Sequence, residues 1–340
     1  MIRVKKYNNL QKEELEKLKR FLEINEPNIL PYHTIEFAKV IDEFFGYRNL
    51  SLVAFNDQGE VIGYLPQWKK RKVIESVPWR DKGGPIYDNE DVLITFINKT
   101  KKMVNQLNLK GFIWKDFQTR FLENYSYFVN IEIELTEYTI ESYWNKLPSK
   151  TRRAIRSAEK NGLIFKIEKQ NIHNAIKAFY DLFITNRKKL GVPVYPIDFF
   201  KAYFEYIPQK QIKMFTIYKD NVPVASLILL HNCYKAIYAY PASNELGKKL
   251  RANDMMVYNV IKYCIKNGIK YFDFGADSPL QTGLIRFKSK WLGKKRFIIT
   301  SFYGNVREID HNKPKYNLIR KIIKKMPTKF YITFSKIIVK

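Results

Sequence analysis

A run of chemically useful side chains occupies residues 272–293, which read FDFGADSPLQTGLIRFKSKWLG. Its first part predicts a strand that ends near Asp273, followed by a loop that begins at Gly275. The Asp273 carboxylate and the next backbone amides would then lie at a sheet edge, where ligands often bind. Farther on, Arg286, Lys288 and Lys290 alternate with Phe, Ser and Trp. A second strand would put these three cations on one face, suited to hold an anionic group. The alternative is an ordinary surface strand whose basic side chains face solvent.

A second basic stretch, YWNKLPSKTRRAIRSAEKNGLIF, predicts a helix with Ser149 as its N-cap and Gly162 as its C-terminal stop. Basic side chains recur there at every fourth position and form one stripe. Solvated helices usually mix charges along a face, so phosphate or carboxylate binding and a plain solvated face both fit. The basic residues of the stripe and its flank are Arg152, Arg153, Arg156 and Lys160.

Composition predicts a folded globular protein that is large enough for two domains. The chain has 340 residues, of which 46% are hydrophobic and 15% aromatic. No run approaches the roughly 18 apolar residues of a membrane span, and the first residues carry no apolar signal core. Two cysteines, Cys233 and Cys264, fit neither a disulfide framework nor a zinc site. We therefore expect a cytoplasmic protein with reduced cysteines and no bound metal.

The net charge of +27 is concentrated in three stretches. Residues 144–162 carry six Lys or Arg against one acid, residues 286–296 carry six against none, and residues 306–340 carry ten against two. Such clustering favours a polyanionic partner, which is RNA, a phosphorylated small molecule or an anionic membrane surface. General use of lysine as a solubilising residue explains part of the same excess.

An internal repeat indicates two related domains. The pattern LSLVAFNDQGEVIGYLPQWKKRKVIESVP, ending at Pro78, is echoed by KMFTIYKDNVPVASLILLHNCYKAIYAYP, ending at Pro241. Each copy predicts three strands, then a helix over roughly 90–107 or 253–266, then a strand that a glycine precedes. In those last strands Gly111 and Asp116 correspond to Gly268 and Asp273. The period is far longer than the 20 to 50 residues of a solenoid repeat, so the pattern indicates duplicated domains, with chance similarity of two β-meanders as the alternative.

Several of these pieces together resemble one protein family, over roughly residues 30–305. They are HTIEFAKVIDEFFG, GEVIGYLPQ, the GGP loop, LPSKTRRAIRSAEKNGL, RKKLGVPVYPIDFF, AYPAS and FDFG…GLIRFKSKWLG. The chain resembles the Fem-type aminoacyltransferases, the FemAB-related branch of the GNAT N-acyltransferase superfamily. The resemblance implies an α+β fold of two tandem GNAT-like domains, each a mixed, mainly antiparallel sheet flanked by helices. We expect domains at 1–143 and 164–305, a basic linker helix at 144–163 and a basic tail at 306–340.

The activity implied by the resemblance is transfer of an aminoacyl group from aminoacyl-tRNA to an amine of a cell-envelope precursor. Peptidoglycan, pseudomurein and a surface glycan all fit as the acceptor polymer, and no permanently bound cofactor is implied. An aminoacyl ester is already activated, so the enzyme must orient the amine and stabilise the developing oxyanion. The acceptor precursor is nucleotide-linked or lipid-linked, which places the protein in the cytoplasm or at the inner face of the membrane.

Site residues are carried over at the matching positions. Lys288 is the first candidate for contacting the acyl carbonyl or a phosphate, with Asp273 as the group that holds the amine or accepts its proton. Arg286 assists Lys288, and the basic-helix residues Arg152, Arg153 and Arg156 bind substrate phosphate. The remaining substrate-binding candidates are Tyr240, Asn253 and Asp116. Each also has a structural interpretation, as a loop cap, a core aromatic or a rim cation.

Two departures from the family pattern keep alternatives open. Related proteins commonly have an Arg-Ser pair after the FDFG-like strand, whereas this chain has Ala276-Asp277-Ser278. Acetyl-CoA enzymes bind pyrophosphate through a glycine-rich loop before a helix, and the matching segment here, NELGKKLRANDMM, has one glycine. The first alternative is an acyl-CoA-dependent N-acetyltransferase acting on an amino sugar or polysaccharide precursor. The second is a non-catalytic RNA- or membrane-binding protein on the same fold.

The tail, residues 306–340, predicts a basic amphipathic helix that ends at Pro327. Its apolar face comprises Leu318, Ile319, Ile322, Ile323 and Met326. Lysines and an arginine occupy the other face. Binding to an anionic membrane and docking onto the protein core explain this pattern equally well.

Overall fold

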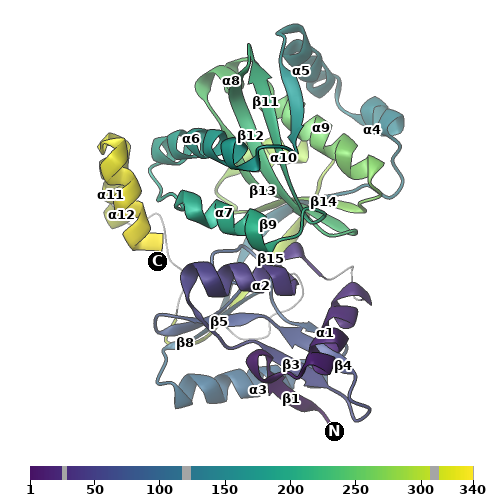
Figure 1. Ribbon diagram of the computed structural model, residues 1–340, viewed down its shortest axis with the longest axis vertical. Coiled ribbons are helices and arrows are strands. Elements are labelled where there is room, and N and C mark those ends of the chain that lie inside the picture. Colours follow the sequence, from purple (N-terminus) through teal and green to yellow (C-terminus); the bar gives the residue numbers. More distant parts are fainter. Residues whose placement is uncertain (25–28, 117–123, 307–313, 340) are drawn as a thin grey trace. The chain divides into compact units, whose positions relative to one another are not determined.

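The computed structural model describes residues 1–24, 29–116, 124–306 and 314–339 (Figure 1). The chain forms two compact units, each assembled from three segments. Both units differ from the continuous ranges expected from the sequence, because the chain returns to the first unit after Gly275. Unit 1 consists of Met1–Ile131, Ala276–Ile285 and Lys295–Glu308, and unit 2 consists of Glu132–Gly275, Arg286–Lys294 and Ile309–Lys340.

Unit 1 contains a four-stranded antiparallel sheet that packs against two helices. Its strands, in the order in which they pair, are β1 (Arg3–Lys6), β3 (Leu52–Phe55), β4 (Val61–Leu65) and β7 (Ile86–Tyr87). Successive side chains of a strand point to opposite faces. Val53 therefore joins the apolar cluster around α1 (Lys12–Ile24), and Leu52 joins the cluster around α3 (Glu90–Gln106). Burial on both faces explains why this strand is apolar throughout.

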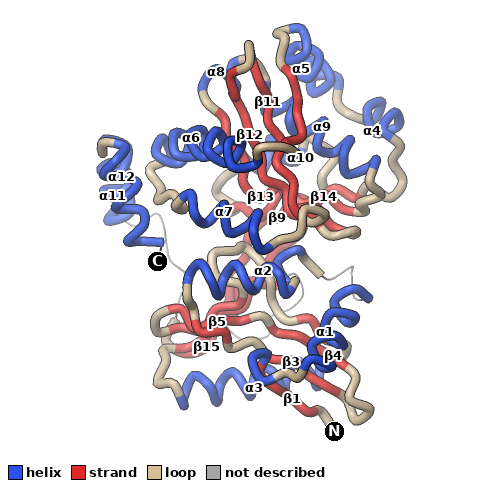
Figure 2. The backbone as a smooth tube through the Cα atoms, viewed as in Figure 1, coloured by secondary structure: helices blue, strands red, loops and turns tan. Residues whose placement is uncertain are grey.

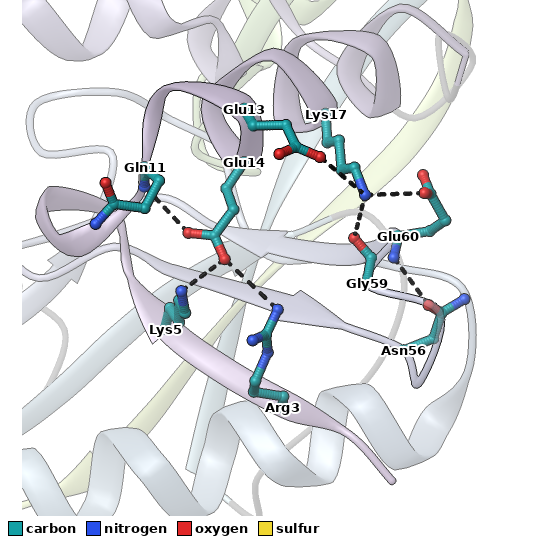
Figure 3. A network of polar contacts seen from close by, with 9 residues as sticks. All are labelled: Arg3, Lys5, Gln11, Glu13, Glu14, Lys17, Asn56, Gly59 and Glu60. Carbon is teal, nitrogen blue, oxygen red and sulfur yellow. Dashed lines mark hydrogen bonds and ion pairs between the residues drawn. The ribbon is translucent and has the colours of Figure 1, made fainter.

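Ion pairs join α1 to the strands beneath it (Figure 3). The Glu14 carboxylate accepts from Lys5 Nζ at 2.6 Å and from Arg3 at 3.5 Å. Lys17 Nζ lies 3.1 Å from Glu60, in the turn between β3 and β4. Pairs of this kind, open to solvent, contribute about 1 kcal/mol or less, so they orient the helix more than they stabilise the unit.

The remaining strands of unit 1 bring together segments that are distant in the sequence. In pairing order they are β15 (Lys294–Gly304), β8 (Gly111–Asp116), β6 (Val73–Ser76), β5 (Gln67–Lys70) and β2 (Arg48–Asn49). All of these pairs are antiparallel except β6 with β8, which is parallel. The helix α2 (Ile35–Val40) completes this unit, with the Thr34 hydroxyl as its N-cap.

Unit 2 is built on a sheet of paired strands, which Figure 2 draws in red. In pairing order they are β10 (Ile164–Glu168), β11 (Ile212–Lys219), β12 (Val222–His231), β13 (Lys235–Ser243) and β14 (Tyr271–Asp277). The first four pair antiparallel, and β13 pairs with β14 in parallel. Another strand, β9 (Asn124–Glu134), passes from the residues of unit 1 to those of unit 2.

Helices cover both faces of the unit 2 sheet. The register pairs Phe215 with Leu227 and Leu227 with Pro241, so the adjacent Tyr240 faces the side opposite to Phe215. Phe215 contacts Tyr263 of α9 (Ala252–Lys266), whereas Tyr240 contacts aromatic rings of α6 (Ile172–Leu190) and α7 (Ile197–Tyr206). The other helices of this unit are α4 (Ile140–Lys146), α5 (Ser149–Lys160), α8 (Glu245–Lys249), and the tail helices α11 (Pro314–Lys325) and α12 (Thr328–Val339).

The internal repeat is visible in the topology. The helices expected at 90–107 and 253–266 are α3 and α9, and each is followed by a strand, β8 or β14, that pairs in parallel with the last strand of its hairpin set. The copies differ in their middle strand. In the second copy β12 is continuous, whereas in the first copy Pro66 separates β4 from β5 and the two halves join different sheets. Proline donates no backbone hydrogen bond, so it favours such a break.

A substitution at Gly111 tests this register. Gly111 begins β8 opposite Gly304, and a Cβ added to it would lie 1.8 Å from the carbonyl oxygen of Tyr303. That oxygen belongs to the backbone and cannot move without breaking the β8–β15 ladder. We expect Gly111→Ala to lower the free energy of unfolding by at least about 2 kcal/mol, measured by urea titration.

The repeat supplies a matched control for Gly111. Its counterpart Gly268 has a φ of +68°, with no atom within 4 Å of an added Cβ. Gly268→Ala therefore meets only left-handed backbone strain, about 1 kcal/mol. Equal losses in the two variants would show that the contact with Tyr303 does not determine the cost.

The tail docks on unit 2. α11 packs against α6, and at Gly191, where φ is +72°, an added Cβ would lie 2.7 Å from the carbonyl oxygen of Arg320. In α12 the Tyr331 hydroxyl donates to the carbonyl oxygen of Val192 at 2.7 Å. Of the two interpretations of the tail, docking onto the core is thus observed. Within the described ranges, no helix combines the length and the apolar character needed to cross a bilayer.

Candidate active site

The parallel strands β13 and β14 pair over three residues and then separate. Their register ends with Ile237 opposite Asp273. Beyond it β13 stays paired with β12 as far as Ser243, while β14 continues to Asp277. Beyond Ile237 and Asp273, the backbone N–H and C=O groups of β13 and β14 therefore do not pair with each other. The carboxyl ends of neighbouring parallel strands are a common place for ligands in α/β proteins.

Asp273 and Lys288, the two predicted catalytic residues, meet at Gly275. Asp273 is fully buried, and its Oδ1 accepts a hydrogen bond from the Gly275 N–H at 2.7 Å. Lys288 is 7% exposed, and its Nζ donates to the Gly275 carbonyl oxygen at 3.0 Å. Gly275 has a φ of +78°, which favours glycine at this position. The carboxylate thus holds Gly275 near the end of β14, and the Gly275 carbonyl in turn holds the lysine ammonium.

The expectation that Arg286, Lys288 and Lys290 share one face of a strand is wrong. Residues Thr282–Ser289 form the helix α10. Residues two apart on a helix lie about 200° apart, so Lys288 points inward while Arg286 is exposed. Alternation over only five residues fits either element, and the turn at Ser278, which accepts from the Gln281 N–H, leads into a helix.

The end of α10 is held by contacts from two other helices. Lys290 forms an ion pair with Asp254, near the start of α9. The carbonyl oxygen of Trp291 accepts from the Tyr143 hydroxyl of α4 at 2.9 Å. Burial raises the pKa of Tyr143 well above its usual value, so this hydroxyl stays a donor. These side chains position α10, and with it Lys288.

Tyr240 and Asn253 lie at the end of β13 and the start of α9. Tyr240 is buried in an aromatic cluster, and its hydroxyl lies 2.9 Å from that of Tyr203. Asn253 donates through Nδ2 to Ser243 Oγ at 3.2 Å. The Tyr240 contact joins β13 to α7 and the Asn253 contact joins β13 to α9, as the structural interpretation of both residues requires.

Comparison with known proteins covers both this region and the whole chain. Residues 145–289, which contain the contacts of Asp273 and Lys288, match the acetyltransferase (GNAT) domain family. The crystal structure of FemX superimposes with a TM-score of 0.67, covers 92% of this chain and 99% of that chain, and is 14% identical in sequence. This is a GNAT-fold protein. The likeness to FemX confirms the fold that the Fem-type resemblance implied.

Two further solved structures have a similar fold. One is L-PGS from Bacillus licheniformis, with a TM-score of 0.53, 13% identity and coverage of 86% of this chain and 98% of that chain. The other is a tandem GNAT protein from the clavulanic acid biosynthesis pathway, with a TM-score of 0.54, 7% identity and coverage of 90% and 100%. The predicted fold class of tandem GNAT-like domains is confirmed. No curated protein matches the sequence.

The basic helix is α5, inside the GNAT domain match. Its inner side packs as predicted, with Ile155 and Ala158 fully buried. The predicted cap is wrong: Pro148 holds the N-cap position and Ser149 is the first helical residue, an arrangement compatible with the non-helical backbone that a cap requires. Gly162 follows the C-cap with a φ of +68°, as expected for a C-terminal stop.

The predicted phosphate-binding arginines of α5 differ in their surroundings. Arg152 is half-buried and donates to the carbonyl oxygen of Asn145 at 3.4 Å, whereas Arg153 is exposed. The Arg156 guanidinium lies over the ring of Trp144, 5.4 Å from its centroid. Arg156 and Trp144 also line an open depression of unit 2, completed by Ile140, Glu141, Glu159, Tyr258 and Lys262. With two acids beside two cations, this depression carries no net positive charge.

In unit 1, Asp116 ends β8 beside the GGP loop. A Cβ on Gly84 would lie 2.8 Å from the Asp116 Cβ, so glycine permits the loop to approach the strand. Nearby in sequence, Lys82 is fully buried, with Nζ 2.8 Å from Asn130 Oδ1 and 3.5 Å from Asp81. Burial acts to raise the pKa of Asp81, but Lys82 and a hydrogen bond from Ala276 hold it below its usual value.

Sequence reasoning did not single out these buried charges. Lys82 directly precedes the GGP loop, which was the one available signal. Lys290 was predicted only as one of three alternating cations, and its partner Asp254 was not predicted as a charged partner. A lysine that is buried becomes apparent only once the surrounding chain is in place.

Proposed function

We propose that the protein transfers an aminoacyl group from aminoacyl-tRNA to an amine of a cell-envelope precursor, in the cytoplasm and without a permanently bound cofactor. Peptidoglycan, pseudomurein and surface-glycan precursors all carry suitable acceptor chemistry. The proposal is supported by the GNAT domain match at residues 145–289, by the whole-chain likeness to FemX and by the chemistry of Lys288.

The reaction requires few groups. The neutral acceptor amine attacks the carbonyl carbon of the aminoacyl ester, a C–N bond forms, and the carbonyl oxygen becomes negatively charged. Collapse of this intermediate breaks the ester C–O bond and releases the terminal hydroxyl of the tRNA, which takes the proton that the amine loses. The enzyme's main contribution is to orient the amine and to place a positive charge beside the oxyanion.

The observation that carries the proposal is the position of the Lys288 ammonium. It is buried and held at the Gly275 carbonyl, where β14 has separated from β13. A charge that is already fixed in a region of low dielectric stabilises a developing oxyanion more strongly than a mobile surface lysine does. Asp273 acts in this proposal by holding Gly275, and Arg286 and the α5 arginines contribute positive charge for the phosphates of the donor.

The segment before α9 favours aminoacyl-tRNA over acyl-CoA as donor. Acyl-CoA enzymes of this superfamily present free backbone amides there to a pyrophosphate. Here residues 245–249 form α8, and Asn244 Oδ1 accepts from the Gly247 N–H at 2.8 Å. Further amides of the segment donate to backbone carbonyls: those of Lys248, Leu250, Arg251, Asp254 and Met255.

A donor screen tests the proposal. Purified protein is incubated with one donor class at a time, charged tRNAs or acyl-CoAs, together with nucleotide- and lipid-linked envelope precursors. The masses of the products are measured by mass spectrometry. We expect a mass increase of one aminoacyl residue on an acceptor amine, dependent on charged tRNA. Transfer from acyl-CoA alone would make the protein an N-acetyltransferase instead. Salt-sensitive tRNA binding with no product on any acceptor would indicate a non-catalytic binding protein.

A further inference from the structure

The docked tail leaves a second apolar stripe in solvent. On α11, Ile323 is fully buried against unit 2, while Leu318 and Ile322, on another side of the same helix, are 60% and 50% exposed. On α12, Tyr331 is fully buried, while Phe330 and Ile337 are 69% and 72% exposed. Docking onto the core therefore leaves several apolar side chains of the tail uncovered.

These exposed side chains align along each helix. Leu318 and Ile322 are four residues apart, and Phe330 and Ile337 are seven apart, so each pair lies on one side of its helix. Successive residues turn by about 100°, so Lys325, seven residues after Leu318, follows the stripe on the same side of α11, and Lys329 lies beside Phe330 near the start of α12. Both helices thus carry an apolar stripe bordered by lysine.

The charge of the tail is of one sign. Residues 316–339 contain six Lys or Arg and neither Asp nor Glu. The central part of a protein–protein interface usually carries few charged side chains. An apolar stripe bordered by lysines is instead typical of helices that lie at the surface of an anionic membrane. Proteins recognise RNA by stacking on its bases and by contacting its phosphates. Exposed aliphatic side chains therefore do not indicate an RNA-binding surface.

We propose that the outer faces of α11 and α12 bind the surface of an anionic lipid bilayer, while their inner faces stay docked on unit 2. Leu318, Ile322, Phe330 and Ile337 enter the boundary between headgroups and acyl chains, and the neighbouring lysines contact lipid phosphates. The surface is independent of the transfer reaction, and it brings unit 2 to a place where lipid-linked amines are concentrated.

The test uses the full chain, because Ile323 and Tyr331 are buried in unit 2 and a truncation would expose their partners. Ile322→Ser/Phe330→Ser removes two solvent-exposed side chains and is expected to fold normally. Binding is measured by co-sedimentation with vesicles of equal parts phosphatidylglycerol and phosphatidylcholine. We expect the apparent affinity to fall about tenfold or more in this variant.

The matched control removes equally exposed apolar side chains elsewhere. Ile94 on α3 and Val222 at the start of β12 are 52% and 58% exposed. We expect Ile94→Ser/Val222→Ser to bind vesicles as the wild type does. Since the net charge of +27 attracts any anionic surface, only the difference between these two apolar variants locates the contact in the tail.

A second measurement reports insertion directly. Phe330→Trp places an indole on the proposed face, and lipids brominated near the headgroup should quench its added fluorescence when vesicles are present. Three results would overturn the proposal: no vesicle binding by the wild type, the same loss in the tail variant and in the control, or no quenching of the added tryptophan. Loss of tRNA binding with unchanged vesicle binding in the tail variant would assign the face to RNA and also overturn it.

Discussion

A Lys288→Met enzyme is expected to transfer the aminoacyl group about 100-fold or more slowly than the wild type, with its fold intact. Lys288 Nζ is held at the Gly275 carbonyl, so its charge is in place before the oxyanion forms and needs no reorganisation. Methionine has a similar length and can fill the same buried position without the charge. The measurement is the single-turnover rate at saturating charged tRNA and acceptor, with the thermal midpoint as a check of folding.

Two companion variants separate charge from packing. Lys266→Met removes an exposed lysine near the end of α9 and should leave the rate unchanged. Lys288→Arg keeps the charge with a planar group of different shape, so it should retain more activity than Lys288→Met. A Lys288→Met rate equal to that of the wild type would remove the lysine from the mechanism and leave Arg286 as the remaining cation of α10.

Lys235→Met is expected to lower the free energy of unfolding by about 3 to 5 kcal/mol. Lys235 and Glu132 are 2% and 5% exposed, and Lys235 Nζ lies 2.6 Å from Glu132 Oε2. Removing the lysine leaves a carboxylate in a region from which water is excluded, and that desolvation is the main cost. The pair also joins β9 to the first residue of β13, so its loss affects the strand that leads to the site. Urea titration measures the change.

The double variant Glu132→Leu/Lys235→Met decides between desolvation and lost attraction. If the buried carboxylate causes the loss, replacing both charges recovers most of it, because an apolar pair has no desolvation cost. If the double variant is less stable than Lys235→Met, the attraction within the pair was the larger contribution. The two singles and the double together form a double-mutant cycle that isolates the interaction energy.

Much of the fold follows from local patterns in the sequence. The repeat indicated α3 with β8 and α9 with β14, because amphipathic periodicity and a preceding glycine are local signals. The division of the first copy at Pro66 was not predicted, although proline is a known strand breaker, because the flanking runs are both apolar enough to read as one hairpin. The exchange of segments between the units was not predicted either, since strand partners far apart in the chain leave no local mark.

The residues of the candidate site could be selected from the sequence, but their arrangement could not. Lys288 and Asp273 were selected from the FDFG and FK residues, and the structure brings both to Gly275. Asp273 lies in a strand as predicted, but the strand expected for Lys288 was wrong, because five alternating residues fit a strand and a helix equally well. The partners that hold the site, such as Asp254 for Lys290, lie in other helices and could be found only from the folded chain.

The segmented construction of the units has a consequence for synthesis. β8 ends at Asp116, but the strand that pairs with it, β15, ends at Gly304. At about 5 to 20 residues per second, a ribosome needs roughly 10 to 40 seconds to make the intervening chain. During that interval one edge of β8 lies open on the nascent polypeptide, and open edges invite pairing with other chains. The newly made protein therefore passes through a vulnerable period that ends only when β15 has been translated and can pair with β8.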